Sequence, residues 1–134
     1  MGPVDDDDRN RQAMASAANA AYYDAFERKD FATMSSLWEP SDRTVCTHPG
    51  WPPIHGTDKI LQSYASIFNG PQTLQFILTN ELVVADGTLA YVSIDENLVD
   101  ESGSTSSTSG LNIFGWIDGR WLMVVHHASP IMSR

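Results

Sequence analysis

One histidine stands directly before a rigid, proline-rich turn, where a proton-transfer group would be held in place. His48 opens the segment His-Pro-Gly-Trp-Pro-Pro, residues 48–53. Its three prolines cannot donate backbone hydrogen bonds, and each forces the preceding residue into an extended conformation. Imidazole shuttles protons well near neutral pH. His48 is therefore our candidate general base, and the alternative is a histidine at a rim that only binds a backbone carbonyl.

Two further histidines, His126 and His127, are adjacent within the last predicted strand. Successive side chains of a strand point to opposite faces, so only one of the two can face the interior. The residues that share a face with each histidine are largely apolar, so periodicity does not decide between them. The alternative for the inward histidine is a structural bond to a neighbouring strand or to a second subunit.

A polar face runs along the predicted strand 88–99. Its members alternate along the chain: Tyr91, Ser93, Asp95 and Asn97. The opposite face is apolar and is interrupted only by Glu96. The polar set either lines a cavity or faces solvent. If Asp95 lies beside His48 or His127, the two groups would shift each other's pKa as an acid–base couple.

The elements that must carry these side chains are three helices followed by strands. Apolar spacing, caps and stop signals predict helices over 9–29, 30–39 and 57–69. A short strand is predicted at 44–47. Longer strands are predicted at 73–85, 88–99, 111–117 and 120–129, with Asp-Gly turns at 86–87 and 118–119. The Ser/Thr/Gly-rich segment 101–109 is predicted to be a loop, or a loop that runs into a strand.

This order predicts an α+β domain in which helices cover one face of a single curved antiparallel sheet. A cone of this kind can hold a small ligand. Trp51 and the prolines beside it would form an apolar lip over the mouth. The remaining aromatic bulk is equally expected of a core: Trp38, Phe68, Phe76, Phe114 and Trp116. Residues 9–134 are expected to form one domain after an acidic, disordered tail at 1–8.

Composition removes several classes of function. The 134 residues hold 8 basic and 17 acidic side chains, for a net charge of −9. Nucleic acid and acidic membrane surfaces are therefore not expected as partners. A single cysteine, Cys46, excludes an internal disulfide and is expected to be a small buried strand residue. No histidine spacing favours a metal site, so no metal or other cofactor is expected, and the cytoplasm is the expected location.

Several motifs together resemble the nuclear transport factor 2-like superfamily, in its SnoaL-like and ketosteroid-isomerase-like branch, over residues 12–131. The motifs are Ala-Ala-Tyr-Tyr-Asp-Ala-Phe at 20–26, Asp-Phe at 30–31, Val-Cys-Thr-His-Pro-Gly at 45–50, Gly56, Asp-Gly-Arg-Trp at 118–121 and His-His-Ala-Ser-Pro at 126–130. The last two are also similar to the association domain of calcium/calmodulin-dependent kinase II, an oligomerisation module. The resemblance implies a cone-shaped, cystatin-like sheet covered by three N-terminal helices.

The resemblance also implies roles for individual residues. Ketosteroid isomerases carry an acidic general base before the proline where this chain has His48, which argues against steroid isomerisation itself. His127 matches the family's recurrent histidine two residues before a serine, so it is the favoured inward histidine. A tyrosine of the first helix donates to the oxyanion in the isomerases, and Tyr22 or Tyr23 can take that role. The alternative for these tyrosines is aromatic packing.

Together these inferences predict a pocket for a small apolar organic ligand in a homodimer, with cofactor-free isomerase, cyclase or hydratase chemistry. The predicted catalytic residues are His48, His127, Asp95 and Tyr22. The predicted ligand-binding residues are Trp51, Tyr23, Tyr91, Asn112, Phe114, Trp38 and Phe68. The alternative is a non-catalytic ligand-binding or homo-oligomerisation module of the same fold.

Overall fold

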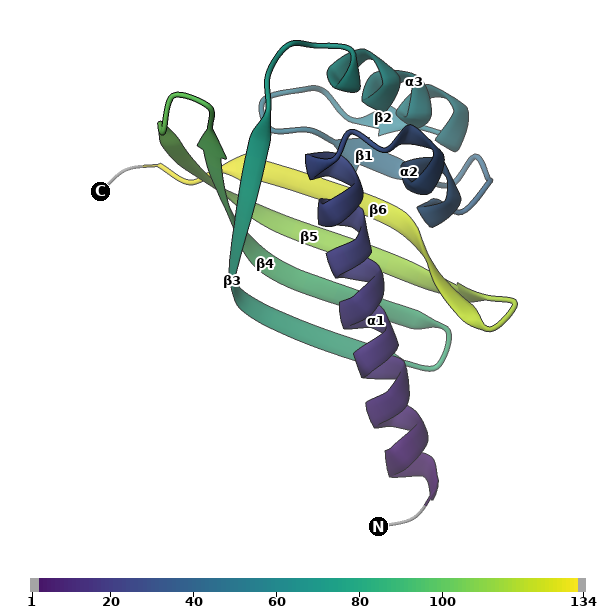
Figure 1. Ribbon diagram of the computed structural model, residues 1–134. Coiled ribbons are helices and arrows are strands. Elements are labelled where there is room, and N and C mark those ends of the chain that lie inside the picture. The colour runs from purple at the N-terminus through teal and green to yellow at the C-terminus, as the bar shows by residue number, and fades with distance from the viewer. Residues whose placement is uncertain (1–2, 133–134) are drawn as a thin grey trace.

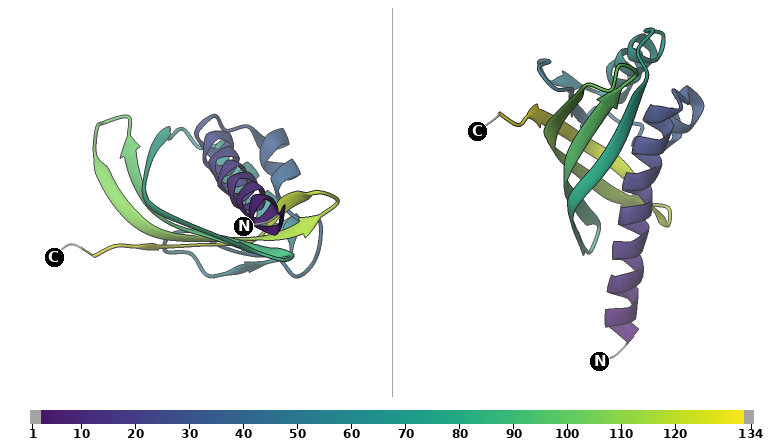
Figure 2. Two further views of the ribbon diagram at one scale, coloured as in Figure 1. Left: turned by 90° about the horizontal axis from the view of Figure 1, so that it is seen from below. Right: turned by 60° about the vertical axis from the view of Figure 1, so that its left-hand side comes forward.

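Three helices cover one face of a curved, unclosed sheet (Figure 1, Figure 2). The computed structural model describes residues 3–132. The helices are α1 (Pro3–Glu27), α2 (Phe31–Leu37) and α3 (Thr57–Phe68). The strands are β1 (Val45–Thr47), β2 (Ile54–His55), β3 (Leu74–Asp86), β4 (Leu89–Asp100), β5 (Thr105–Ile117) and β6 (Arg120–Pro130). The predicted α+β class, with three helices on a curved sheet, is confirmed.

The six strands follow the order β2-β1-β6-β5-β4-β3. All neighbours are antiparallel except β1 and β6, which run parallel and place Cys46 opposite His126. The parallel pair departs from the purely antiparallel sheet that the sequence predicts. Its cause is the short β1, which enters the sheet beside the last strand and brings the residue after it, His48, next to β6.

Two element boundaries differ from those predicted. Helix α1 begins at Pro3, so the acidic segment 5–8 expected as a tail is helical, and its first turns extend beyond the sheet (Figure 2). Proline and acidic residues both suit the first turn of a helix. Strand β5 begins at Thr105, inside the predicted loop, because the Ser/Thr-rich residues pair with the end of β4. Among the described residues, no helix has a stretch long and apolar enough to cross a lipid bilayer.

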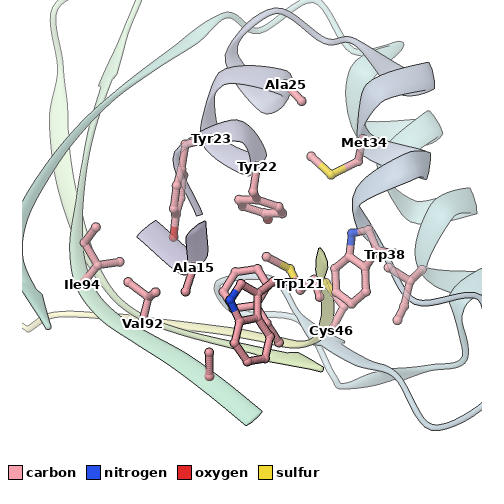
Figure 3. Packing of buried hydrophobic residues seen from close by; sticks show 14 of the residues in the cluster. Ala15, Tyr22, Tyr23, Ala25, Met34, Trp38, Cys46, Val92, Ile94 and Trp121 are labelled. Carbon is pink, nitrogen blue, oxygen red and sulfur yellow. The ribbon is translucent and has the colours of Figure 1, made fainter. Parts of the chain in front are cut away.

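The hydrophobic core lies between α1, α2 and the sheet. Figure 3 shows Tyr22 and Tyr23 projecting from α1, with Met34 and Trp38 on the side of α2. Val92 and other β4 side chains close this layer from the sheet. Burial of such apolar area is the main force that holds helices on a sheet. The core therefore fixes the position of α1, and with it the two tyrosines.

Candidate functional site

A cavity of about 570 Å³ lies between the C-terminal half of α1, the turn after β1, the end of α3 and strands β3, β4 and β6. Most of its lining is hydrophobic. Phe26 meets Phe68 and Phe76 edge to face, with ring centroids 5.6 and 5.1 Å apart. A volume of this size suits a small organic molecule. Its ionisable groups come from separate elements: Tyr22, Tyr23 and Lys29 from α1 and the residues after it, His48 from the turn, Glu96 from β4 and His126 from β6.

His48 reaches the cavity from the residue after β1, and its side chain is buried. Ser63 on α3 donates its hydroxyl to the carbonyl oxygen of Ile60 at 2.6 Å, so the serine oxygen accepts from His48 Nε2 at 2.8 Å. The ring proton therefore lies on Nε2, and Nδ1 keeps its lone pair, with the Cys46 sulfur 3.9 Å away as its weak neighbour. Burial lowers the pKa of His48 to about 4, so this imidazole is neutral near pH 7.

Strand β6 directs His126 into the same cavity. Its Nδ1 lies 2.5 Å from the side-chain oxygen of Asn112. The Asn112 amide nitrogen already donates to Asn19 Oδ1 at 2.7 Å and to the Tyr23 hydroxyl at 3.1 Å, so the Asn112 oxygen is the acceptor. The His126 ring proton thus lies on Nδ1, and Nε2 is the nitrogen with a free lone pair.

The two imidazoles share one environment. Their ring centroids are 6.5 Å apart, and the Tyr22 ring lies 4.9 Å from that of His126. Burial, together with the nearby His48 and His127, lowers the pKa of His126 to about 3. The cavity therefore contains two neutral imidazoles, each held by a hydrogen bond through one nitrogen and basic at the other.

A buried carboxyl group, that of Glu96 on β4, lines the same cavity as the two imidazoles. The hydroxyls of Tyr23 and Thr108 donate to the two oxygens of Glu96. In the described part of the chain it forms no ion pair. Burial raises the pKa of Glu96, and the two hydrogen bonds offset part of that rise. The carboxyl group therefore retains its proton to a higher pH than an exposed glutamate does.

Room for this carboxyl group depends on a glycine in the neighbouring strand. Gly110 of β5 lies opposite Ile94, two residues from Thr108, which pairs with Glu96. A Cβ atom at Gly110 would stand 3.0 Å from Glu96 Oε2 and 3.2 Å from its Cδ, closer than ordinary contact. The absence of a side chain at Gly110 therefore allows Glu96 to lie against the strand backbone.

Tyrosine hydroxyls form a third polar group. The hydroxyls of Tyr22 and Tyr64 are 2.5 Å apart, and that of Tyr64 lies 3.5 Å from Cys46 Sγ. Burial raises the pKa of both tyrosines well above the ordinary value, so both are neutral donors. Burial also raises the pKa of the Cys46 thiol to about 12, so it stays protonated, as expected for a packed strand residue.

The predicted site residues fall into three groups. Those that line the cavity are His48, Tyr22, Tyr23, Trp51 and Phe68. Trp51 stands at the exposed edge of the cavity, with its ring centroid 4.8 Å from that of His48. Those buried behind the cavity wall are Asn112, Phe114 and Trp38. Asn112 still contributes, because it holds the ring of His126.

The third group lies on the outer face of the sheet, contrary to expectation: His127, Asp95 and Tyr91. His127 is exposed, and Asp95 accepts a hydrogen bond at 2.6 Å from Asn80 in the neighbouring strand. Side chains alternate along a strand, so the inward positions of His126 and Glu96 force their neighbours outward. The inward choice of His127, drawn from the resemblance, was wrong.

Sequence reasoning missed Glu96 as a site residue. It was noted only as an interruption of an apolar face, and that interruption was the available signal, because a lone acid on the face that helices cover must be buried. No comparable signal existed for His126, whose neighbours match those of His127 in polarity. The roles of Ser63 and Asn112 depend on contacts between distant segments.

The described residues offer no cluster of metal-ligating side chains. Within residues 3–132, no three His, Cys, Asp or Glu side chains come together as ligands of one ion would. The polar groups of the cavity are instead arranged in hydrogen-bonded sets, each with its own partner in a neighbouring element.

Comparison with known proteins gives a consistent result. The model of the SnoaL-like domain family matches residues 15–133. A candidate dehydratase of the nuclear transport factor 2-like family from Streptomyces avermitilis is 34% identical, with a TM-score of 0.86 over 93% of this chain and 99% of that chain.

More distant proteins share the same architecture. A candidate calcium/calmodulin-dependent protein kinase type II association domain from Thiobacillus denitrificans is 27% identical, with a TM-score of 0.75 over 87% of this chain and 94% of that chain. A ketosteroid isomerase-like protein from Erwinia carotovora atroseptica, 21% identical, shares the fold with a TM-score of 0.73 over 92% of this chain and 98% of that chain. F-box protein SKIP8 from Arabidopsis thaliana is 26% identical over 116 residues, 87% of this chain and 49% of the relative. This chain thus spans about half the length of that curated relative.

Proposed function

The chain belongs to the SnoaL-like domain family, and from its cavity we propose a cofactor-free acid–base enzyme that acts on a small, largely apolar organic molecule as an isomerase, cyclase or hydratase. One observation carries this proposal: two neutral imidazoles and a carboxyl group without an ion-pair partner meet in one mostly hydrophobic cavity. Such groups with shifted pKa values in a cavity are typical of acid–base sites. The 34% identity to a candidate dehydratase supports the same class of reaction.

The two imidazoles supply the basic nitrogens. Nδ1 of His48 and Nε2 of His126 carry the free lone pairs, and Ser63 and Asn112 hold the opposite edges of the rings. Their low pKa values keep both lone pairs available at neutral pH. One of them removes a proton from a carbon next to a substrate carbonyl, and the bonding electron pair moves to the carbonyl oxygen.

Glu96 and Tyr22 supply the protons. Burial lets Glu96 keep its proton to a higher pH, and the hydroxyls of Tyr23 and Thr108 stabilise the carboxylate that remains after the proton has left. That proton goes to another substrate carbon in an isomerisation, or to a departing hydroxyl group that leaves as water in a dehydration. The hydroxyl of Tyr22 donates a hydrogen bond to the developing oxyanion.

The test uses 5-nitrobenzisoxazole, a neutral aromatic probe that needs only a base in an apolar cavity. The base removes the ring C–H proton, the N–O bond breaks, and a coloured cyanophenolate forms. We expect wild-type protein to catalyse this opening, and the double variant His48→Asn/His126→Asn to lose about a hundredfold in kcat/KM. His127→Asn on the outer face is the matched control and should keep the wild-type rate. A double variant that folds and is as fast as wild type would exclude these bases.

A second candidate, a homo-oligomerisation module, rests on the outer face of the sheet. Ile77 and Leu111 are 52% and 38% exposed on that face, on β3 and β5. The similarity to a kinase association domain favours a second copy of this chain as the occupant. We expect sedimentation velocity to show a dimer that Leu111→Asp converts to monomer. A wild-type monomer at every concentration would contradict this candidate, and the ring-opening assay decides separately whether the cavity is catalytic.

A further inference from the structure

A single lysine supplies the positive charge among the residues that line the cavity. Lys29 lies just after α1, half-buried, and donates from Nζ to the carbonyl oxygen of Gly70 at 2.7 Å. In the described part of the chain it forms no ion pair, whereas Arg28 pairs with Asp24 and Asp30. An ammonium group has three donors, so Lys29 retains two N–H groups and an uncompensated charge.

The backbone at Lys29 is also unusual. Its φ is 53°, in the left-handed region that glycine normally occupies after a helix. A cation at a helix C-terminus is favourable in itself, but that interaction does not require the side chain to line a cavity. The left-handed conformation closes the C-terminus of α1, because the Lys29 N–H donates to Phe26 O at 3.1 Å and the Asp30 N–H donates to Ala25 O at 2.9 Å. The observation that points to a binding role is the side chain, which lines the cavity.

Two neutral polar side chains stand near the carbonyl that Lys29 contacts. Ser66 in the last turn of α3 and Gln72 in the loop after it both line the cavity and are exposed. A hydroxyl, an amide and an ammonium group at one rim can all donate to an anion. The cavity thus has a cationic rim, an aromatic middle around Phe26 and a second polar region around Glu96.

We propose that the substrate is a small organic carboxylate, with an aromatic or alicyclic body, whose carboxylate group pairs with Lys29. This inference rests on the proposed function, because it places the reactive carbon at the imidazoles and Glu96 while the rim holds the anion. In a chain of net charge −9, an unpaired ammonium group at a cavity is a specific attractor for a single anionic group. Lys29 is then a positioning residue.

The test is calorimetric titration with two probes of the same shape, 2-naphthoate and its neutral amide, 2-naphthamide. We expect wild-type protein to bind the naphthoate about tenfold more tightly than the amide, as one charge-assisted hydrogen bond gives. Lys29→Met should abolish this preference, and Lys29→Arg should restore it. Lys59→Met is the matched control, because it removes the same charge from an exposed position of α3 that does not line this cavity.

The outcomes separate this inference from the proposed function. Equal affinity of wild type for both probes, or an equal effect of Lys29→Met and Lys59→Met, would overturn the role of Lys29. If wild type still opens 5-nitrobenzisoxazole in that case, the acid–base proposal stands without it. If neither naphthalene probe binds and the ring opening is also absent, both proposals fail.

Discussion

The two faces of strands β4 and β6 carry the same chemical groups in opposite surroundings. On the inner face Glu96 is buried against Tyr23, and His126 is buried against Asn112. On the outer face their neighbours in sequence, Asp95 and His127, lie toward solvent, where Asp95 accepts a hydrogen bond from Asn80. A single step along a strand therefore separates a candidate catalytic group from a surface group.

The difference shows that burial, and not residue type, distinguishes the two sets of groups. Desolvation disfavours a charged form, so it raises the pKa of Glu96 and lowers that of His126 to about 3. The hydrogen bonds on the inner face then decide which atom of each group is free to react. Matched substitutions on the two faces test this comparison directly.

The largest expected effect comes from the two adjacent histidines. His126→Ala should lower the free energy of unfolding by about 3 kcal/mol, because it leaves a void and deprives the Asn112 oxygen of its donor. His127→Ala should change it by less than about 0.5 kcal/mol. Urea unfolding at pH 7 measures both. Similar losses for the two variants would contradict the assignment of faces.

A smaller effect is expected from two glycines of β5 that face different neighbours. Gly110→Ala should cost about 2 kcal/mol, because the new Cβ atom would press on the buried carboxyl group of Glu96. Gly115→Ala meets the guanidinium of Arg43 at 3.1 Å, but that side chain is 64% exposed and can move, so the cost should be under about 1 kcal/mol. Thermal unfolding measures both losses of stability. The reverse order would show that a Cβ atom at position 110 fits beside the Glu96 carboxyl group without displacing it.

The smallest effect concerns pH. Because the pKa of Glu96 is raised on folding, the unfolded chain releases this proton first, and stability is lost as pH rises above the ordinary value of 4.5. Glu96→Gln removes that loss, so its stability relative to wild type should rise with pH above 4.5. Asp95→Asn, which removes a carboxyl group from the outer face, is the matched control. Urea unfolding from pH 4 to 8 measures the trend, and a falling trend would mean that Glu96 is stabilised as the anion.

Local sequence patterns predicted most of the elements. Helical spacing, Asp-Gly turns and proline-rich segments predicted three helices and four long strands, as the structure has them. The proline-rich turn after β1 singled out His48, which lies between the rings of Trp51 and Tyr64. Errors arose where pairing partners decide the outcome. The Ser/Thr-rich start of β5 became a strand because β4 was there to pair with it, and β1 joined β6 in parallel through a contact between distant segments.

The sequence alone determined the α+β class, the helical and strand periods and the position of His48, because these depend on residues near one another in the chain. Only the tertiary structure decided which face of each strand the helices cover. It therefore also decided that His126 and Glu96, and not the predicted His127 and Asp95, line the cavity. The physical reason is that alternation along a strand defines two faces but does not say which one is buried. That choice is made by packing α1 on the sheet, and the free nitrogen of each imidazole is then set by Ser63 and Asn112 from other elements.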